Sequence, residues 1–229
     1  MLGLIKKDLL LLKTNTKAFI GIAIFYIVFG LSADFGPTMA TAMIAMLMGM
    51  QVLSTMQWDE HFKWNPYALT MPLSRKSLVL SKYILSAVTI GIGTVVGLIC
   101  SIITTVVKRL VSISNESIFT METLITIIVI FGAMLFINAI LLPAVFKFGV
   151  EKARILLVVL IALPTFVIVG VAQYISNPNA SKPAFVTAII TWCSEHLLGI
   201  LPVVAVIFLI VAIAISCMLS IKIFEKKEF

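Results

Sequence analysis

Six apolar runs, separated by short polar segments, are the feature that most limits how this chain can fold. They cover residues 18–33, 37–57, 83–107, 123–146, 155–175 and 200–221. A helix needs about 20 apolar residues to cross the ~30 Å hydrocarbon layer of a bilayer, and all but the first run reach that length. Since unpaired backbone groups are not tolerated in lipid, these runs predict an all-α integral membrane protein. We expect six transmembrane helices in a single domain spanning residues 1–229.

The composition agrees with a membrane protein. Of the 229 residues, 61% are hydrophobic and 12% are charged, whereas soluble domains are about 45–50% apolar. The net charge of +7 would suggest nucleic acid in a soluble protein, but the basic residues lie between the apolar runs, so we expect no nucleic-acid partner. With both termini in the cytoplasm, 14 of the 17 Lys and Arg residues are cytoplasmic, in agreement with the positive-inside rule. We therefore expect a multi-pass protein of the cell membrane with cytoplasmic termini.

Two further helices are expected at the membrane surface. Residues 2–17 predict an N-terminal amphipathic interfacial helix, with Lys6 and Lys7 toward the anionic headgroups of the membrane lipid. The alternative is a basic flank that only orients the first span. The apolar face of this helix carries Leu2, Ile5, Leu9 and Leu12. Residues 183–198, which begin with Pro183, are too few for a crossing and predict an outer re-entrant or surface helix before the last span.

None of the six runs contains Asp, Glu, Lys, Arg or His, which argues against several classes of function. Ion-coupled carriers bind the coupling ion at ionisable groups within the membrane, and intramembrane enzymes need constellations of acidic, His or Ser residues. The chain also lacks the Gly-x-x-x-x-Gly-Lys-Ser/Thr loop that binds phosphate. We expect no catalytic residues, bound cofactor or metal in this chain, so energy for any transport must enter from outside the membrane helices.

The second run carries methionines spaced by four, three and four residues, which places them on one helical face. They are Met39, Met43, Met46 and Met50. Methionine is flexible and is common where a surface accepts varied apolar partners. The candidate substrate path is therefore Met43, Met46 and Met50, together with Gln51. Ordinary helix packing is the alternative.

Small residues four positions apart in the third run, Gly93, Gly97 and Ser101, predict a ridge that allows close helix contact. Prolines at 143 and 164 predict kinks in the fourth and fifth spans.

The polar segment from Trp58 to Tyr83 is longer than a connection between two spans requires. It contains two Trp, two acidic residues, four Lys or Arg and two Pro. Aromatic anchors mixed with both charge signs are typical of a surface that contacts another protein, and a belt at the lipid headgroups is the alternative. After Pro72, Ser74 is placed to cap a helix that continues into the third span. On the assigned topology this segment is cytoplasmic.

Two cytoplasmic stretches resemble a known family. Residues 67–83, YALTMPLSRKSLVLSKY, resemble the Tyr, Leu/Thr-Pro-Ile/Leu-Ser-Arg and Ser-Lys-Tyr pattern of the membrane subunits of bacterial ABC exporters of the ABC-2 permease family. Residues 148–154, FGVEKAR, resemble the Gly-x-Glu-Lys-x-Arg element between the fourth and fifth spans of that family. The subgroup suggested by the resemblance contains the small permeases that export phenol-soluble modulins and give resistance to antimicrobial peptides.

The resemblance implies a half-transporter that pairs with a second permease copy or a related permease. Two copies of a separate ABC ATPase subunit, which would hold the ATP and Mg, would drive export of amphipathic peptides or similar membrane-partitioned compounds. Residues 58–82 and 147–154 would be the coupling segments. The ATPase-coupling candidates are Asp59, Glu60, Trp64, Asn65, Tyr67, Ser74, Arg75, Lys76, Gly149, Glu151, Lys152 and Arg154.

Two other functions stay open on the sequence. The long cytoplasmic segment would also suit a membrane sensor or assembly partner that does not transport, and neutral spans would suit a channel or carrier that does not use ATP.

Overall fold

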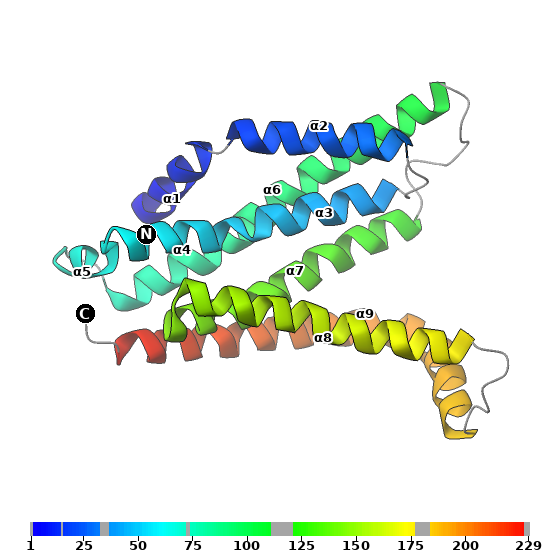
Figure 1. Ribbon diagram of the computed structural model, residues 1–229. Coiled ribbons are helices and arrows are strands. Elements are labelled where there is room, and N and C mark those ends of the chain that lie inside the picture. Colours follow the sequence, from blue (N-terminus) through cyan, green and yellow to red (C-terminus); the bar gives the residue numbers. More distant parts are fainter. Residues whose placement is uncertain are drawn as a thin grey trace.

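The computed structural model of the chain describes residues 2–14, 16–32, 37–71, 74–110, 121–176 and 184–226. Within these ranges every regular element is a helix and no strand is present. The all-helical prediction is therefore confirmed. The helices lie alongside one another as an elongated array (Figure 1). They are α1 (Leu2–Thr14), α2 (Thr16–Ser32), α3 (Pro37–Gly49), α4 (Gln51–His61), α5 (Trp64–Leu69), α6 (Arg75–Leu110), α7 (Met121–Phe148), α8 (Val150–Ser176) and α9 (Ala184–Glu225).

Four helical stretches of the described chain are long and apolar enough to cross a membrane. They are Met39–His61, Arg75–Leu110, Leu124–Phe148 and Val206–Glu225. The pair α1 and α2, bent by 61° at its break, would make a fifth if it acts as one span. The chain is thus a multi-pass membrane protein, and the count of six spans stays a prediction. The 36 residues of α6, at 1.5 Å each, make a helix of about 54 Å, which extends beyond the hydrocarbon layer.

The tightest contact in the array joins α3 to α6, where the predicted small-residue ridge lies. A Cβ added to Gly97 would stand 2.7 Å from the Cα of Thr41, and one added to Gly93 would stand 2.6 Å from the Cβ of Met48. No side chain fits at these separations, so glycine is what allows the two backbones to approach. The predicted packing role of the ridge is confirmed.

One end of the array gathers α1, α5, the start of α6, the junction of α7 with α8, and the end of α9 (Figure 1). We call it the charged end, because Lys7, Asp8, Asp59 and Lys82 lie there. An apolar core beneath it includes Val52, Val79, Leu85, Leu141, Val145, Val150 and Phe224. Burial of these side chains joins the N-terminal, middle and C-terminal helices at this end.

Two polar links add to that core. The hydroxyl of Tyr83 on α6 lies 2.6 Å from Ser216 Oγ and 2.8 Å from Ser220 Oγ on α9. The Ser216 hydroxyl also donates to the carbonyl of Ala139 on α7. Buried hydroxyls are costly without partners, so these bonds hold α6, α7 and α9 in a fixed arrangement.

The start of α6 is fixed as the sequence predicts. Ser74 Oγ accepts a hydrogen bond of 3.2 Å from the Ser77 backbone N–H, which confirms Ser74 as the helix cap. The Arg75 guanidinium donates to the carbonyls of Phe224 and Glu225 at 3.2 and 2.6 Å. Both carbonyls lie in the last turn of α9, so the Arg75 guanidinium joins that turn to the start of α6.

The structure also places the second apolar run and the predicted outer helix. The second apolar run lies in the span-length helical stretch Met39–His61, in which one turn residue, Met50, separates α3 from α4. The predicted outer helix at 183–198 falls at the start of α9, where the orange ribbon runs across the direction of the rest (Figure 1). Pro183 and the side chains of Glu195 and His196 lie outside the described residues, and re-entry into the membrane stays a prediction. Pro143 lies inside α7.

Candidate functional site

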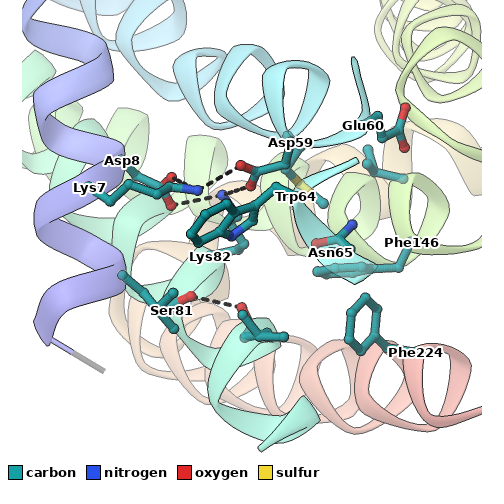
Figure 2. A pocket seen from close by; sticks show the side chains of 14 residues that line it. Lys7, Asp8, Asp59, Glu60, Trp64, Asn65, Ser81, Lys82, Phe146 and Phe224 are labelled. Carbon is teal, nitrogen blue, oxygen red and sulfur yellow. Dashed lines mark hydrogen bonds and ion pairs between the residues drawn. The ribbon is translucent and has the colours of Figure 1, made fainter. Parts of the chain in front are cut away.

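Four charged side chains from three helices meet inside the charged end (Figure 2). Lys82 Nζ of α6 lies 2.8 Å from Asp8 Oδ2 of α1 and 2.6 Å from Asp59 Oδ2 of α4. Lys7 Nζ lies 2.7 Å from Asp59 Oδ1 and 3.2 Å from Asp8 Oδ1. The two lysines and two aspartates therefore alternate in a closed ring, which we call the charge ring.

The charge ring is largely shielded from solvent. The side chains of Asp8, Asp59 and Lys82 are 1%, 6% and 10% exposed, and that of Lys7 is 26% exposed. The Trp64 ring of α5 covers it on one side, with Lys7 Nζ 4.3 Å from the ring centroid. Two positive and two negative charges balance, so the ring is neutral as a group. Loss of any one member leaves an uncompensated charge in a poorly solvated place.

The charge ring corrects one prediction and adds residues that the sequence did not reveal. Lys7 was expected to reach toward lipid headgroups, but it turns inward to Asp59 because two carboxylates attract it more strongly than a solvated surface. Asp8 and Lys82 were not recognised as partners. One feature of the sequence could have indicated the ion pair: Asp8 is the single acidic residue within the helix over 2–14.

A second polar link joins the two predicted coupling segments. Glu60 Oε2, at the end of α4, accepts a hydrogen bond of 3.2 Å from the Val150 backbone N–H at the start of α8. A carboxylate is stabilised at a helix N-terminus, where unpaired N–H groups point outward. The turn before α8 depends on Gly149, whose φ is +85°, a conformation that disfavours residues with a Cβ. Arg154 adds another link by donating to Gln57 Oε1.

These contacts frame a cleft at the surface of the charged end. Its volume is about 640 Å3, and its lining residues come from the end of α4 and the junction of α7 with α8. They are Ser54, Gln57, Trp58, Glu60, His61, Phe148, Gly149, Val150, Glu151 and Lys152. The cleft therefore brings together residues of both predicted coupling segments.

Large aromatic side chains are exposed in and beside this cleft. Trp58 is 49% exposed, Phe148 51% and Phe62 68%, and the rings of Trp58 and Phe62 stack with centroids 5.5 Å apart. Tyr67 on α5 is also exposed. Exposed aromatic side chains among charged residues are the composition of a surface that binds another protein.

The remaining coupling candidates divide by their surroundings. Asp59 is buried in the charge ring, Trp64 and Asn65 are half-buried beside it, and Arg75 is bound to the end of α9. Exposed side chains, in contrast, belong to Glu60, Ser74, Lys76, Glu151, Lys152 and Arg154. The candidates therefore form two groups: exposed side chains that another protein can contact, and buried or half-buried side chains that pack beneath them.

In the described part of the chain, the four residues of the predicted substrate path have different surroundings. Met46 lines an apolar cavity of about 500 Å3 between α3 and α8. Gln51 lines a different cavity of about 410 Å3 bounded by α1, α2, α3, the start of α4 and α6. Met50 packs against the core, and Met43 is 38% exposed. A path along the face of α3 that carries Met43 and Met46 is compatible with this geometry. Gln51 lies on α4 and lines the other cavity.

In the described part of the chain, no group of three or more His, Cys, Asp or Glu side chains is placed to hold a metal ion.

Comparison with known proteins identifies the family of the chain. The family model described as ABC-2 family transporter protein matches residues 3–225. No curated protein and no solved structure matches the chain significantly. The match covers nearly the full sequence, and it agrees with the multi-pass helical fold. The chain therefore belongs to the ABC-2 family of transporter proteins, as a membrane permease of an ABC transporter.

Proposed function

We propose that this permease exports amphipathic peptides or similar membrane-partitioned compounds, driven by two copies of a separate ABC ATPase that bind at its charged end. ATP and Mg would be held by the ATPase, and a second permease chain would complete the membrane part. Family membership supports an ABC ATPase partner in general. The neutral spans support an external source of energy, since they offer no group to bind a coupling ion.

The observation that carries the proposal is the hydrogen bond from Val150 N–H to Glu60, which joins the two predicted coupling segments into one surface. A partner that presses on the α4–α5 segment therefore also acts on the first turn of α8. Since α8 continues for 27 residues from Val150, a tilt at its first turn moves its far end.

The charge ring extends this connection to the other helices. It joins α1, α4 and α6, and Arg75 joins α6 to the end of α9. Movement of the α4–α5 segment is thus passed to helices at both ends of the sequence. Packed elements of this kind respond as bodies that shift between discrete arrangements, which is what alternation between inward and outward openings requires.

The docking part of the proposal is tested with the aromatic side chains of the cleft. The double variant Trp58→Ala with Phe148→Ala is expected to weaken binding of the ATPase encoded beside this chain by tenfold or more, since exposed aromatic anchors carry much of the affinity of an interface. Co-purification and stimulation of ATP hydrolysis are the measurements. Phe25→Ala is the control, because Phe25 is 62% exposed on α2, outside the cleft.

Equal binding by the double variant and the control would contradict docking at this cleft. Absence of any ATPase in complex with the unaltered chain would contradict the wider proposal. If the double variant loses a cellular response while transport continues, the result would instead support the alternative function as a membrane sensor or assembly partner.

The substrate is tested in inside-out vesicles that contain the permease and the ATPase. A fluorescent amphipathic helical peptide is expected to accumulate in the lumen only with ATP and Mg, since export from the cell corresponds to uptake by such vesicles. Accumulation that persists without ATP would contradict an ATP-driven exporter and support the channel or carrier. A peptide of equal composition with its apolar face scrambled serves as control.

A further inference from the structure

The open cavity of about 410 Å3 lined by α1, α2, α3, the start of α4 and α6 takes no part in the proposed docking surface. Its size falls within the ~300–1,000 Å3 range of small-molecule sites. All of its lining side chains but three are apolar: Leu9, Leu12, Phe19, Ile20, Ile22, Ala23, Ile44, Leu47, Met48, Ile92 and Val96. Such a wall suits a hydrocarbon chain, which gains by leaving water or detergent and requires no hydrogen bonds.

The three polar lining residues are Lys13, Gln51 and Thr89. Thr89 donates to the carbonyl of Ser86 at 3.0 Å and needs no ligand. Lys13 has an exposed side chain and lies in the last turn of α1, beside the break before α2. Its charge favours an anionic group at this edge of the cavity.

Gln51 gives a second indication of the ligand, besides the charge of Lys13. Its Nε2 donates to the carbonyl of Leu47 at 3.4 Å, but its Oε1 is buried and has no hydrogen-bond partner among the described residues. A buried acceptor without a partner costs free energy, so the site favours a ligand that donates a hydrogen bond. The cavity therefore combines an apolar wall, a positive charge and an acceptor.

We propose that this cavity binds one acyl chain of an anionic phospholipid whose headgroup carries a hydroxyl, with the phosphate near Lys13 and the hydroxyl donating to Gln51. Lys13 lies beside the break where α1 and α2 bend by 61°, so the phosphate would sit at this edge of the cavity. The bound lipid would fill the space between the α1–α2 pair and α3, so occupancy would set how firmly α1 is held against α3. This proposal does not depend on what the permease exports.

Native mass spectrometry of the purified permease tests the proposal with two lipids of identical acyl chains, phosphatidylglycerol and phosphatidylcholine. We expect one tightly retained phosphatidylglycerol per chain and about a fivefold weaker retention of phosphatidylcholine, the factor expected for one lysine near an anionic headgroup. Lys13→Gln and Gln51→Leu should each reduce this preference while the acyl chain still binds. Equal retention of the two lipids by the unaltered chain would overturn the headgroup part of the proposal.

Two variants fill the cavity from opposite walls. Ala23→Phe on α2 and Val96→Phe on α6 should each abolish the retained lipid, whereas Ile99→Phe should keep it, since Ile99 is 52% exposed on α6 and is not among the lining residues. Circular dichroism identifies any variant that fails to fold, and the other variant then carries the test. Retention of lipid by a folded filling variant, or occupation of the site by an amphipathic peptide in place of lipid, would overturn the proposal.

Discussion

Replacement of Lys82 by methionine tests whether the charge ring holds the charged end together. Methionine keeps much of the apolar stem but leaves two buried carboxylates facing Lys7 alone. Removal of one partner from a buried ion pair costs about 3–5 kcal/mol. With 2–4 °C per kcal/mol for a chain of this size, the melting temperature should fall by roughly 6–20 °C.

The assay is thermal unfolding in detergent, followed with a thiol-reactive dye that labels Cys100, which is buried in the folded protein. Lys76→Met is the matched control, because it removes a lysine from the same helix where the side chain is exposed. The double variant Lys82→Met with Asp8→Asn restores the charge balance of the ring. It should be more stable than the sum of the two single changes predicts, by about 0.5–3 kcal/mol.

A melting temperature of the Lys82→Met variant within about 1 °C of the unaltered chain would refute the reasoning. Strict additivity in the double variant would also refute it, since the ring members would then act independently. High salt should change these differences little, because the ring is shielded from solvent and screening acts mainly on exposed charges.

Three further predictions concern other parts of the array. Gly97→Ala should push α6 away from α3 and cost about 1–3 kcal/mol of stability, whereas Gly91→Ala, which meets nothing closer than 4.0 Å, should cost far less in the same thermal assay. Gly149→Ala should disturb the turn before α8 and so lower the coupling between ATP hydrolysis and transport, because a residue with a Cβ at a φ of +85° costs about 1–2 kcal/mol. Gly170→Ala, where an added Cβ meets nothing within 4 Å, serves as the control. Replacing three methionines together by leucine should preserve volume and the melting temperature while changing which peptides are transported, and unchanged selectivity would assign them to packing. The three are Met43, Met46 and Met50.

Features set by neighbouring residues were predictable from the sequence. The cap at Ser74 depends on a hydroxyl three residues before the N–H that it accepts. The ridge at Gly93 and Gly97 depends on a spacing of four along one helix. In both cases the spacing along the sequence predicts the relative positions of the residues, because the geometry of the helix is fixed.

The charge ring and the link from Glu60 to Val150 could not be predicted in the same way. Asp59 lies 52 residues after Lys7, and Val150 lies 90 residues after Glu60, so no local period relates them. On a single helix, Lys7 had the position of a surface lysine, and only the packing of α4 and α6 against α1 supplies its partners. The sequence predicts the coupling candidates as two segments, whereas their division into exposed and buried residues depends on the fold.

The charge ring also bears on how the protein is made. Its members are synthesised at different times, since Lys82 follows Asp8 by 74 residues along the chain. Until Lys82 emerges, the two aspartates have Lys7 as their single cationic partner within the ring. Neutrality is reached only when the start of α6 has been delivered to the same side of the membrane as α1. A chain in which the start of α6 lay on the other side of the membrane would therefore leave Asp8 and Asp59 with Lys7 alone.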